Sequence, residues 1–205
     1  MPNITVLDTE ERWNRSNLDE YLWWPRVLWI DPGVVSGVAI IWFDPKALFE
    51  RQKTAKVLLA YSELFLHGPE NGRTGQVNHY LKLRDKLDEE PGLVTGCESF
   101  VIRQMNQSWE FLAPVRMRAS IEHEMSMSKP LGSKIIGSGI QLFVQSPSDA
   151  INSFSNDRLR NLRMYTPGPD HVNDAKRHAL LWIRKLVDNR DLFDATHGHE
   201  DGWFS

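Results

Sequence analysis

The sequence predicts an α/β fold in which a mixed sheet of five strands is flanked by helices. Short apolar runs rich in β-branched and aromatic residues alternate along the chain with longer segments whose apolar residues recur at helical spacing. The predicted order is three strands, a helix, a strand, a helix, a strand and a helix. Since each helix must bury its apolar stripe, helices on the faces of one sheet are the economical arrangement.

The first three strands come early in the chain. Residues 27–30 form an apolar run that ends at an Asp-Pro-Gly turn, and a second run follows over 37–43, so the pair predicts a β-hairpin. Residues 57–65, with β-branched and aromatic content, predict the third strand. Leucines and a valine at helical spacing predict a helix over 77–87, which the Pro-Gly pair at 91–92 ends.

Two more strands and two helices complete the predicted sheet. Residues 93–101 are a short apolar stretch, 109–125 predict a long helix, and 140–144 predict the fifth strand. A Ser-Pro-Ser-Asp sequence then opens a helix at residue 146. The last helix has the clearest pattern: after a possible N-cap at Asp170, an apolar stripe recurs at steps of three and four residues.

Size and composition favour one globular domain. The 205 residues predict an N-terminal extension over 1–24 that packs by its aromatics, a core domain over 25–188 and a C-terminal tail over 189–205. No apolar stretch is long enough for a membrane span, and no signal sequence opens the chain, so we expect a cytoplasmic location. The single cysteine, Cys97, excludes an internal disulfide and a cysteine-rich zinc site.

The net charge of the chain says little about whether it binds nucleic acid. The net charge of −3 lacks the basic footprint of an obvious nucleic-acid binder. Carboxylates gathered for a metal ion would, however, cancel basic residues in the total while leaving local basic surfaces intact.

Acidic residues stand where apolar strands end. Asp31 follows the first strand, and Glu98 lies inside another apolar stretch, an awkward place for an ionised group unless a cation relieves it. On the last helix, His171, Asp174 and His178 follow one line at the margin of the apolar stripe. Taken singly, these residues favour ordinary interpretations as a turn residue, an edge-strand acid and helix-terminal charges. Taken together, they predict a metal site.

Such a set suits phosphodiester hydrolysis. Two divalent ions, Mg²⁺ or Mn²⁺, prefer carboxylate oxygens, activate water and stabilise the leaving oxygen. A histidine at the rim can ligate, orient water or transfer a proton near neutral pH.

Three sequence segments resemble the RuvC family of Holliday-junction resolvases. The stretch VLWIDPG at 27–33 with SGVA at 36–39 is similar to its first strand and turn, and GCESF at 96–100 to its acidic fourth strand. The strongest match is DHVNDA at 170–175 with RHAL at 177–180, which resembles its closing helix. The segments QSPSDA at 145–150 and NDRL at 156–159 look like those of bacteriophage versions.

The resemblance implies an RNase H-like fold and a metal-dependent endonuclease that resolves four-way junctions and other branched DNA. It makes Asp31, Glu98, His171 and Asp174 the catalytic and metal-binding four, with Mg²⁺ or Mn²⁺, two ions per site, as cofactor. His171 departs from an all-carboxylate site, so its role as ligand or base stays open. The resemblance also implies a homodimer, with the helix over 109–125 as its candidate interface.

Basic residues flank the predicted site and are candidates for DNA contact. They are Arg103, Arg116, Arg118, Lys129, Lys134, Arg158 and Arg160, and with less weight Arg163, Lys176 and Arg177. Two other features are discounted: the His/acid cluster at 197–201 is interpreted as a solvated tail, and His178 equally suits a structural partner of a neighbouring acid.

Three other functions compete. An actin-like ATPase also begins with a hairpin carrying Asp and Gly, but it normally needs a second such domain. A catalytically silent branched-DNA binder would have no reason to fill all four positions with metal ligands. An RNase H-fold nuclease acting on flaps or RNA is not separated from a junction resolvase by sequence.

Overall fold

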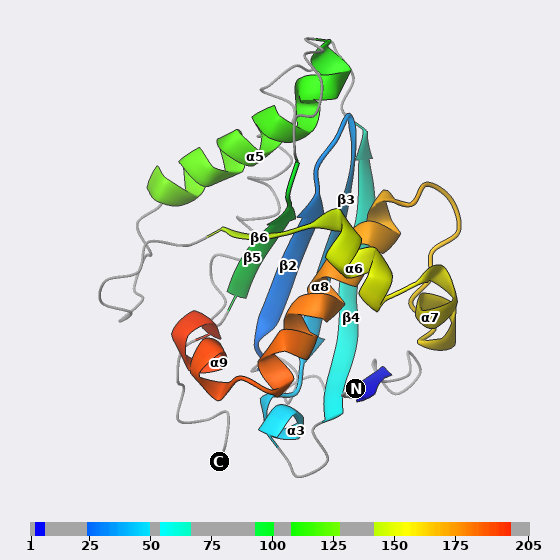
Figure 1. The fold of residues 1–205 in the computed structure, drawn as a ribbon, viewed down its shortest axis with the longest axis vertical. Helices are drawn as coiled ribbons and strands as arrows, with labels where there is room; N and C mark the ends of the chain where they lie inside the picture. Colours follow the sequence, from blue (N-terminus) through cyan, green and yellow to red (C-terminus); the bar gives the residue numbers. More distant parts are fainter. Residues whose placement is uncertain are drawn as a thin grey trace.

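The structure is a computed structural model that describes residues 3–6, 24–49, 54–66, 93–100, 108–127 and 142–197. Figure 1 shows one sheet with helices on both faces. None of the helices in these ranges has the length and apolar character that crossing a membrane requires.

The five predicted strands are present and form a mixed sheet. A hairpin of β2 (Arg26–Asp31) and β3 (Val35–Phe43) continues antiparallel into β4 (Thr54–Leu66). On the other side of β2, β5 (Leu93–Glu98) and β6 (Phe143–Gln145) follow in parallel. Because β2 and β5 run the same way, their carboxyl ends reach the same edge of the sheet.

A sixth strand, β1 (Asn3–Val6), comes from the segment predicted to be an extension that packs by its aromatics. It pairs in parallel with β4, beginning with Asn3 opposite Thr54, and gives the order β1-β4-β3-β2-β5-β6. Ile4 is buried in the main core. Four residues are too few to show a strand periodicity, which is why sequence reasoning missed this strand. Residues 7–23 lie outside the described residues.

One face of the sheet is covered by α8 (His171–Val187), with α6 (Pro147–Ser153), α7 (Asn156–Asn161) and α9 (Arg190–His197) gathered around it (Figure 1). The apolar stripe of α8 packs on Val27 and Trp29 of β2 and on neighbouring strands. The short helix α3 (Pro45–Phe49) lies at the far end of the hairpin.

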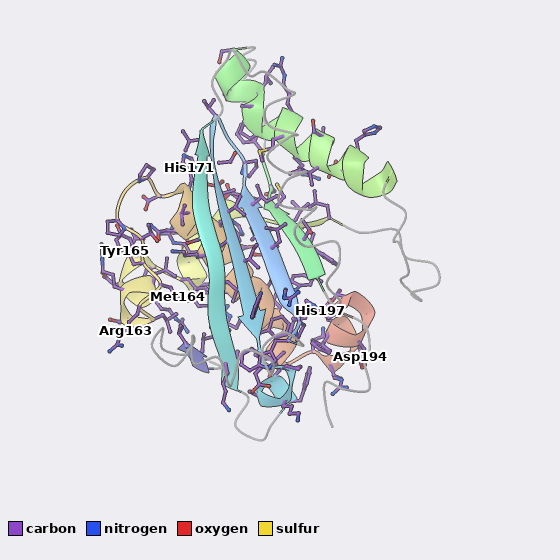
Figure 2. The ribbon with its side chains drawn as sticks, turned by 180° about the vertical axis from the view of Figure 1, so that it is seen from behind. Arg163, Met164, Tyr165, His171, Asp194 and His197 are labelled. Atoms are coloured by element: carbon purple, nitrogen blue, oxygen red, sulfur yellow. The ribbon has the colours of Figure 1, made fainter. Side chains whose placement is uncertain are left out.

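The opposite face carries α5 (Trp109–Met127), seen from behind in Figure 2. Its Met117 and Ile121 pack on Leu28 and Ile30, the two β2 residues that alternate with Val27 and Trp29. All six residues of β2 are therefore buried, as expected of a central strand covered on both sides.

Other predictions meet mixed outcomes. The helix predicted over 109–125 is confirmed by α5, and Pro147 is the first residue of α6, as the Ser-Pro sequence predicts. The predicted strand over 140–144 is described at Phe143–Gln145. Asp170 precedes α8, but its side chain makes no capping hydrogen bond. The helix predicted over 77–87 lies outside the described residues.

The interpretation of His197 as part of a solvated tail is wrong. His197 ends α9 with a relative exposure of only 2%, and its ring contacts Phe43 and Phe193. Phe193 is fully buried against Phe43, so α9 covers the end of the core. In Figure 2, His197 and His171 lie well apart along the sheet, which separates this histidine from the predicted site. Residues 198–205 lie outside the described residues.

Candidate active site

The first acid of the site, Asp31, is the last residue of β2 and pairs with Gly37 across the hairpin. A Cβ on Gly37 would overlap the backbone carbonyl of His171, so glycine at this position lets the start of α8 rest directly on β3. His171 Nδ1 consequently donates to Asp31 Oδ2 at 2.7 Å. The imidazole of His171 is 41% exposed, so this pair stands at the rim of the site.

The second acid, Glu98, ends β5. Register pairs Ile30 with Cys97, so Asp31 and Glu98 are the next residues on two parallel strands. His178 of α8 approaches Glu98, with 3.0 Å between His178 Nε2 and Glu98 Oε2. Of the two interpretations of His178, ligand or structural partner of an acid, the contact in the structure corresponds to the second.

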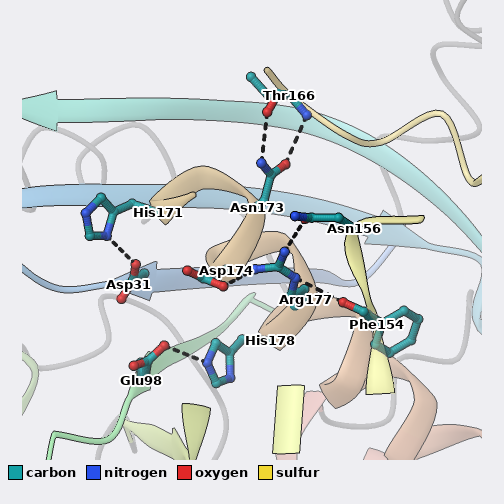
Figure 3. Close-up of polar contacts among 10 residues, drawn as sticks. All are labelled: Asp31, Glu98, Phe154, Asn156, Thr166, His171, Asn173, Asp174, Arg177 and His178. Carbon is teal, nitrogen blue, oxygen red and sulfur yellow. Dashed lines mark hydrogen bonds and ion pairs between the residues drawn. The ribbon is translucent and has the colours of Figure 1, made fainter. Parts of the chain in front are cut away.

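The third acid, Asp174, lies three residues after His171 on α8 and pairs with Arg177. Arg177 also donates to Asn156 Oδ1 and, at 2.9 Å, to the carbonyl oxygen of Phe154. Figure 3 shows the carboxylates of Asp31, Glu98 and Asp174 close together beside the start of α8, each turned toward a nitrogen-bearing side chain. The structure thus brings all four predicted site residues to one place.

Burial and the charges of neighbouring side chains shift the pKa values of residues in the site. Burial raises the pKa of Asp31 to about 6, and the negative charges of Glu98 and Asp174 add to the rise while the hydrogen bond from His171 opposes it. Burial also raises the pKa of Asp174, with Glu98 and Asp170 adding to the rise and Arg177 opposing it. The hydrogen bond to Asp31 raises the pKa of His171. This pattern describes one region of concentrated negative potential.

The donor set fits a hard divalent cation, since three carboxylates and a rim imidazole suit Mg²⁺ or Mn²⁺. Within the described ranges, however, no group of three or more His, Cys, Asp and Glu side chains is arranged so that it could hold a metal ion. Each carboxylate instead faces a protein nitrogen, from His171, His178 or Arg177. An ion would take over part of the charge compensation that these groups now supply.

The loop that leads into α8 is anchored by residues that sequence reasoning did not assign to the site. Asn173 bonds the backbone of Thr166 through both ends of its amide, and Lys176 Nζ donates to the Met164 carbonyl at 2.8 Å and to Thr166 Oγ1 at 2.6 Å. Polar residues on an amphipathic helix do not reveal such partners in sequence, because the partners lie on a connection of irregular structure.

The candidate DNA-contact residues have varied positions. Arg116 is exposed on α5, and Arg118 on the same helix pairs with Glu122. On α7, Arg158 lies over the ring of Phe154, and the exposed Arg160 lies over Tyr165. Arg103, Lys129 and Lys134 lie outside the described residues.

Two basic residues that the sequence suggested for phosphate contact are buried. Lys176 is 1% exposed, and Arg177 is held by three acceptors of the protein itself. Both are therefore structural in this arrangement, and their inclusion was wrong because the polar margin of α8 is covered by α6, α7 and the loop before α8.

No known family model matches the sequence, and no curated protein sequence matches it. Two solved structures from Thermus thermophilus are similar in fold. The first, described as T. thermophilus RuvC in complex with Holliday junction substrate, is 14% identical over 80% of this chain and 96% of its own, with a TM-score of 0.55. The second, a structure of Thermus thermophilus RuvC, is 16% identical over 83% and 95%, with a TM-score of 0.50.

These likenesses show the fold. The chain has the RNase H-like fold of RuvC, with a mixed sheet flanked by helices. The similarity of residues 145–159 to bacteriophage versions stays a prediction.

Proposed function

We propose that this protein is a divalent-metal-dependent endonuclease that cuts branched DNA, with four-way junctions as its main substrate. The observation that carries the proposal is the meeting of Asp31, Glu98 and Asp174 where β2, β5 and the start of α8 converge. The similarity in fold to a RuvC captured with a Holliday junction supports the choice of substrate.

Each residue of the site has a role in the proposal. Asp31, Glu98 and Asp174 would hold Mg²⁺ or Mn²⁺, which would supply activation of a water and stabilisation of the leaving oxygen. His171, exposed at the rim and within hydrogen-bonding distance of Asp31, ligates an ion or moves a proton to or from the reacting water.

In the proposal, basic residues around the site bind the DNA substrate. Arg116 and Arg118 on α5 and Arg158 and Arg160 on α7 are assigned to phosphates, with selectivity arising from the shape and bendability of the junction. A twofold homodimer through α5 would present two sites to a near-symmetric four-way junction.

The test is cleavage of junction, fork, flap, duplex and RNA–DNA hybrid substrates in Mg²⁺ and in Mn²⁺. We expect the junction to be cut fastest and chelation with EDTA to stop cutting. Asp31→Asn should bind the junction with unchanged affinity but cut it about a thousandfold more slowly, because metal ions contribute several kcal/mol to such reactions.

Asp194→Asn on α9 is the matched control, since it makes the same chemical change on an acid paired with Arg190 at the other end of α8. It should cut like the wild type. Full cutting by Asp31→Asn in Mg²⁺ would contradict the metal-site proposal, and preference for flaps or hybrids would replace the proposed substrate.

A further inference from the structure

His178 joins the ends of two strands to α8. Its imidazole is 1% exposed, with Nε2 at 3.0 Å from Glu98 Oε2 and Nδ1 at 3.1 Å from Gln145 Oε1. Glu98 and Gln145 are register partners on β5 and β6. One side chain from α8 therefore bridges neighbouring residues at the carboxyl edge of the sheet.

The plane of this imidazole is fixed by the sheet beneath it. The ring of Trp29 stacks on His178 with 5.5 Å between ring centroids and 5° between planes. Trp29 pairs with Gly96, and a Cβ on Gly96 would overlap the indole ring. Glycine on β5 thus makes room for Trp29, and Trp29 in turn orients His178.

The hydrogen bonds also indicate which nitrogen of the His178 ring carries a proton. Since the Glu98 carboxylate only accepts, His178 Nε2 must donate to it. Within the described ranges, Gln145 Nε2 is buried with no hydrogen-bond partner. Exchanging the two ends of this amide lets its NH₂ group donate to His178 Nδ1 while Nε2 carries the ring proton that Glu98 accepts, and it moves the carbonyl oxygen to the unpaired position.

We propose that His178 is a positioning residue for Glu98 in the metal site, acting through the chain Gln145–His178–Glu98. It holds Oε2 of Glu98 at the imidazole, so that Oε1 would be the oxygen available to a divalent ion. The proposal rests on the proposed function, because Glu98 is a metal ligand only there. Groups that orient a ligand in this way typically change metal affinity by about 10- to 100-fold when removed.

The chain offers a matched control for a purely structural role. His197 is also buried and stacked on an aromatic ring, that of Phe193, and it accepts from Trp182 Nε1 at 3.4 Å. It lies well apart from His171 along the sheet (Figure 2). Replacing His197 therefore removes a comparable core imidazole without touching the site.

The experiment measures the Mn²⁺ dissociation constant of the full-length protein by electron paramagnetic resonance, with no DNA present. We expect His178→Leu to weaken Mn²⁺ binding by about 10- to 100-fold. His178→Gln, whose amide N–H can still donate to Glu98, should recover most of the affinity. His197→Leu should bind Mn²⁺ like the wild type while losing stability in urea unfolding.

Several outcomes would overturn the proposal. One is Mn²⁺ affinity in His178→Leu within about twofold of wild type, and another is an equal loss in His197→Leu. Should His178→Leu fail to fold, Gln145→Leu provides a second test, because it keeps His178 and removes the side chain that bonds His178 Nδ1. It should weaken Mn²⁺ binding several-fold, and unchanged affinity would overturn the idea. Absence of Mn²⁺ binding in the wild type would refute the proposed function itself.

Discussion

Two imidazole–carboxylate pairs, both from α8, differ in which partner is buried. In the pair of His171 and Asp31 the carboxylate is buried and the imidazole stands at the rim, whereas in the pair of His178 and Glu98 the imidazole is the buried member. A rim imidazole can turn toward water or phosphate at little cost. A buried imidazole with two polar partners and a stacked ring is a fixed part of the structure. The difference separates a residue suited to chemistry from one suited to support.

Each pair also depends on a glycine in the sheet. Gly37 allows the backbone of His171 to touch β3, and Gly96 allows Trp29 to lie under His178. Gly37 makes room for a helix backbone, whereas Gly96 makes room for an aromatic ring. Substitution at each should therefore have separable consequences.

The largest expected difference between the two pairs is in how much each contributes to the free energy of unfolding. His178→Leu leaves Glu98 and Gln145 without their partner in a mostly buried place, so we expect a loss of about 2 to 3 kcal/mol in the free energy of unfolding. His171→Leu should cost about 1 kcal/mol or less, because water can replace an imidazole at the rim. Urea unfolding of both variants checks this, and equal losses would remove the distinction between the pairs.

The second expected effect concerns Gly37, the glycine beneath the pair of His171 and Asp31. Gly37→Ala forces the start of α8 away from β3, which should cost about 1 to 3 kcal/mol and slow DNA cleavage. Gly33→Ala, in the turn of the same hairpin, is a useful comparison because its Cβ would meet Val35 and not α8. If cleavage by the two variants fell equally after correction for the folded fraction, Gly37 would have no special link to His171.

Sequence predicted the elements that carry the site better than the contacts inside it. Asp31 and Glu98 were found because a charged residue at the end of an apolar strand is unusual, and α8 was found by its periodicity. The partners of His178 and Arg177 depend on how β6, α6 and α7 fold over α8, which no local pattern encodes. The burial of His197 was missed for the same reason, since it depends on the far end of the core.

Another predicted effect concerns the loop that leads into the pair of His171 and Asp31. Burial lowers the pKa of Lys176 to about 8, so the unfolded chain binds more protons than the folded one between this value and the usual lysine pKa of 10.5. Stability should therefore rise with pH across this window in the wild type relative to Lys176→Met. Urea unfolding at pH 7.5, 9 and 10.5 measures the difference, and parallel curves would show that Lys176 stays charged when folded.

The most direct test of the metal site is a double-mutant cycle on Mn²⁺ affinity, using Asp31→Asn, Glu98→Gln and the two combined. If both acids hold the same ion, the wild type binds Mn²⁺, each single variant binds it more weakly, and the double variant loses less than the product of the two single losses. An absence of Mn²⁺ binding in the wild type, or losses that simply multiply, would contradict a shared site.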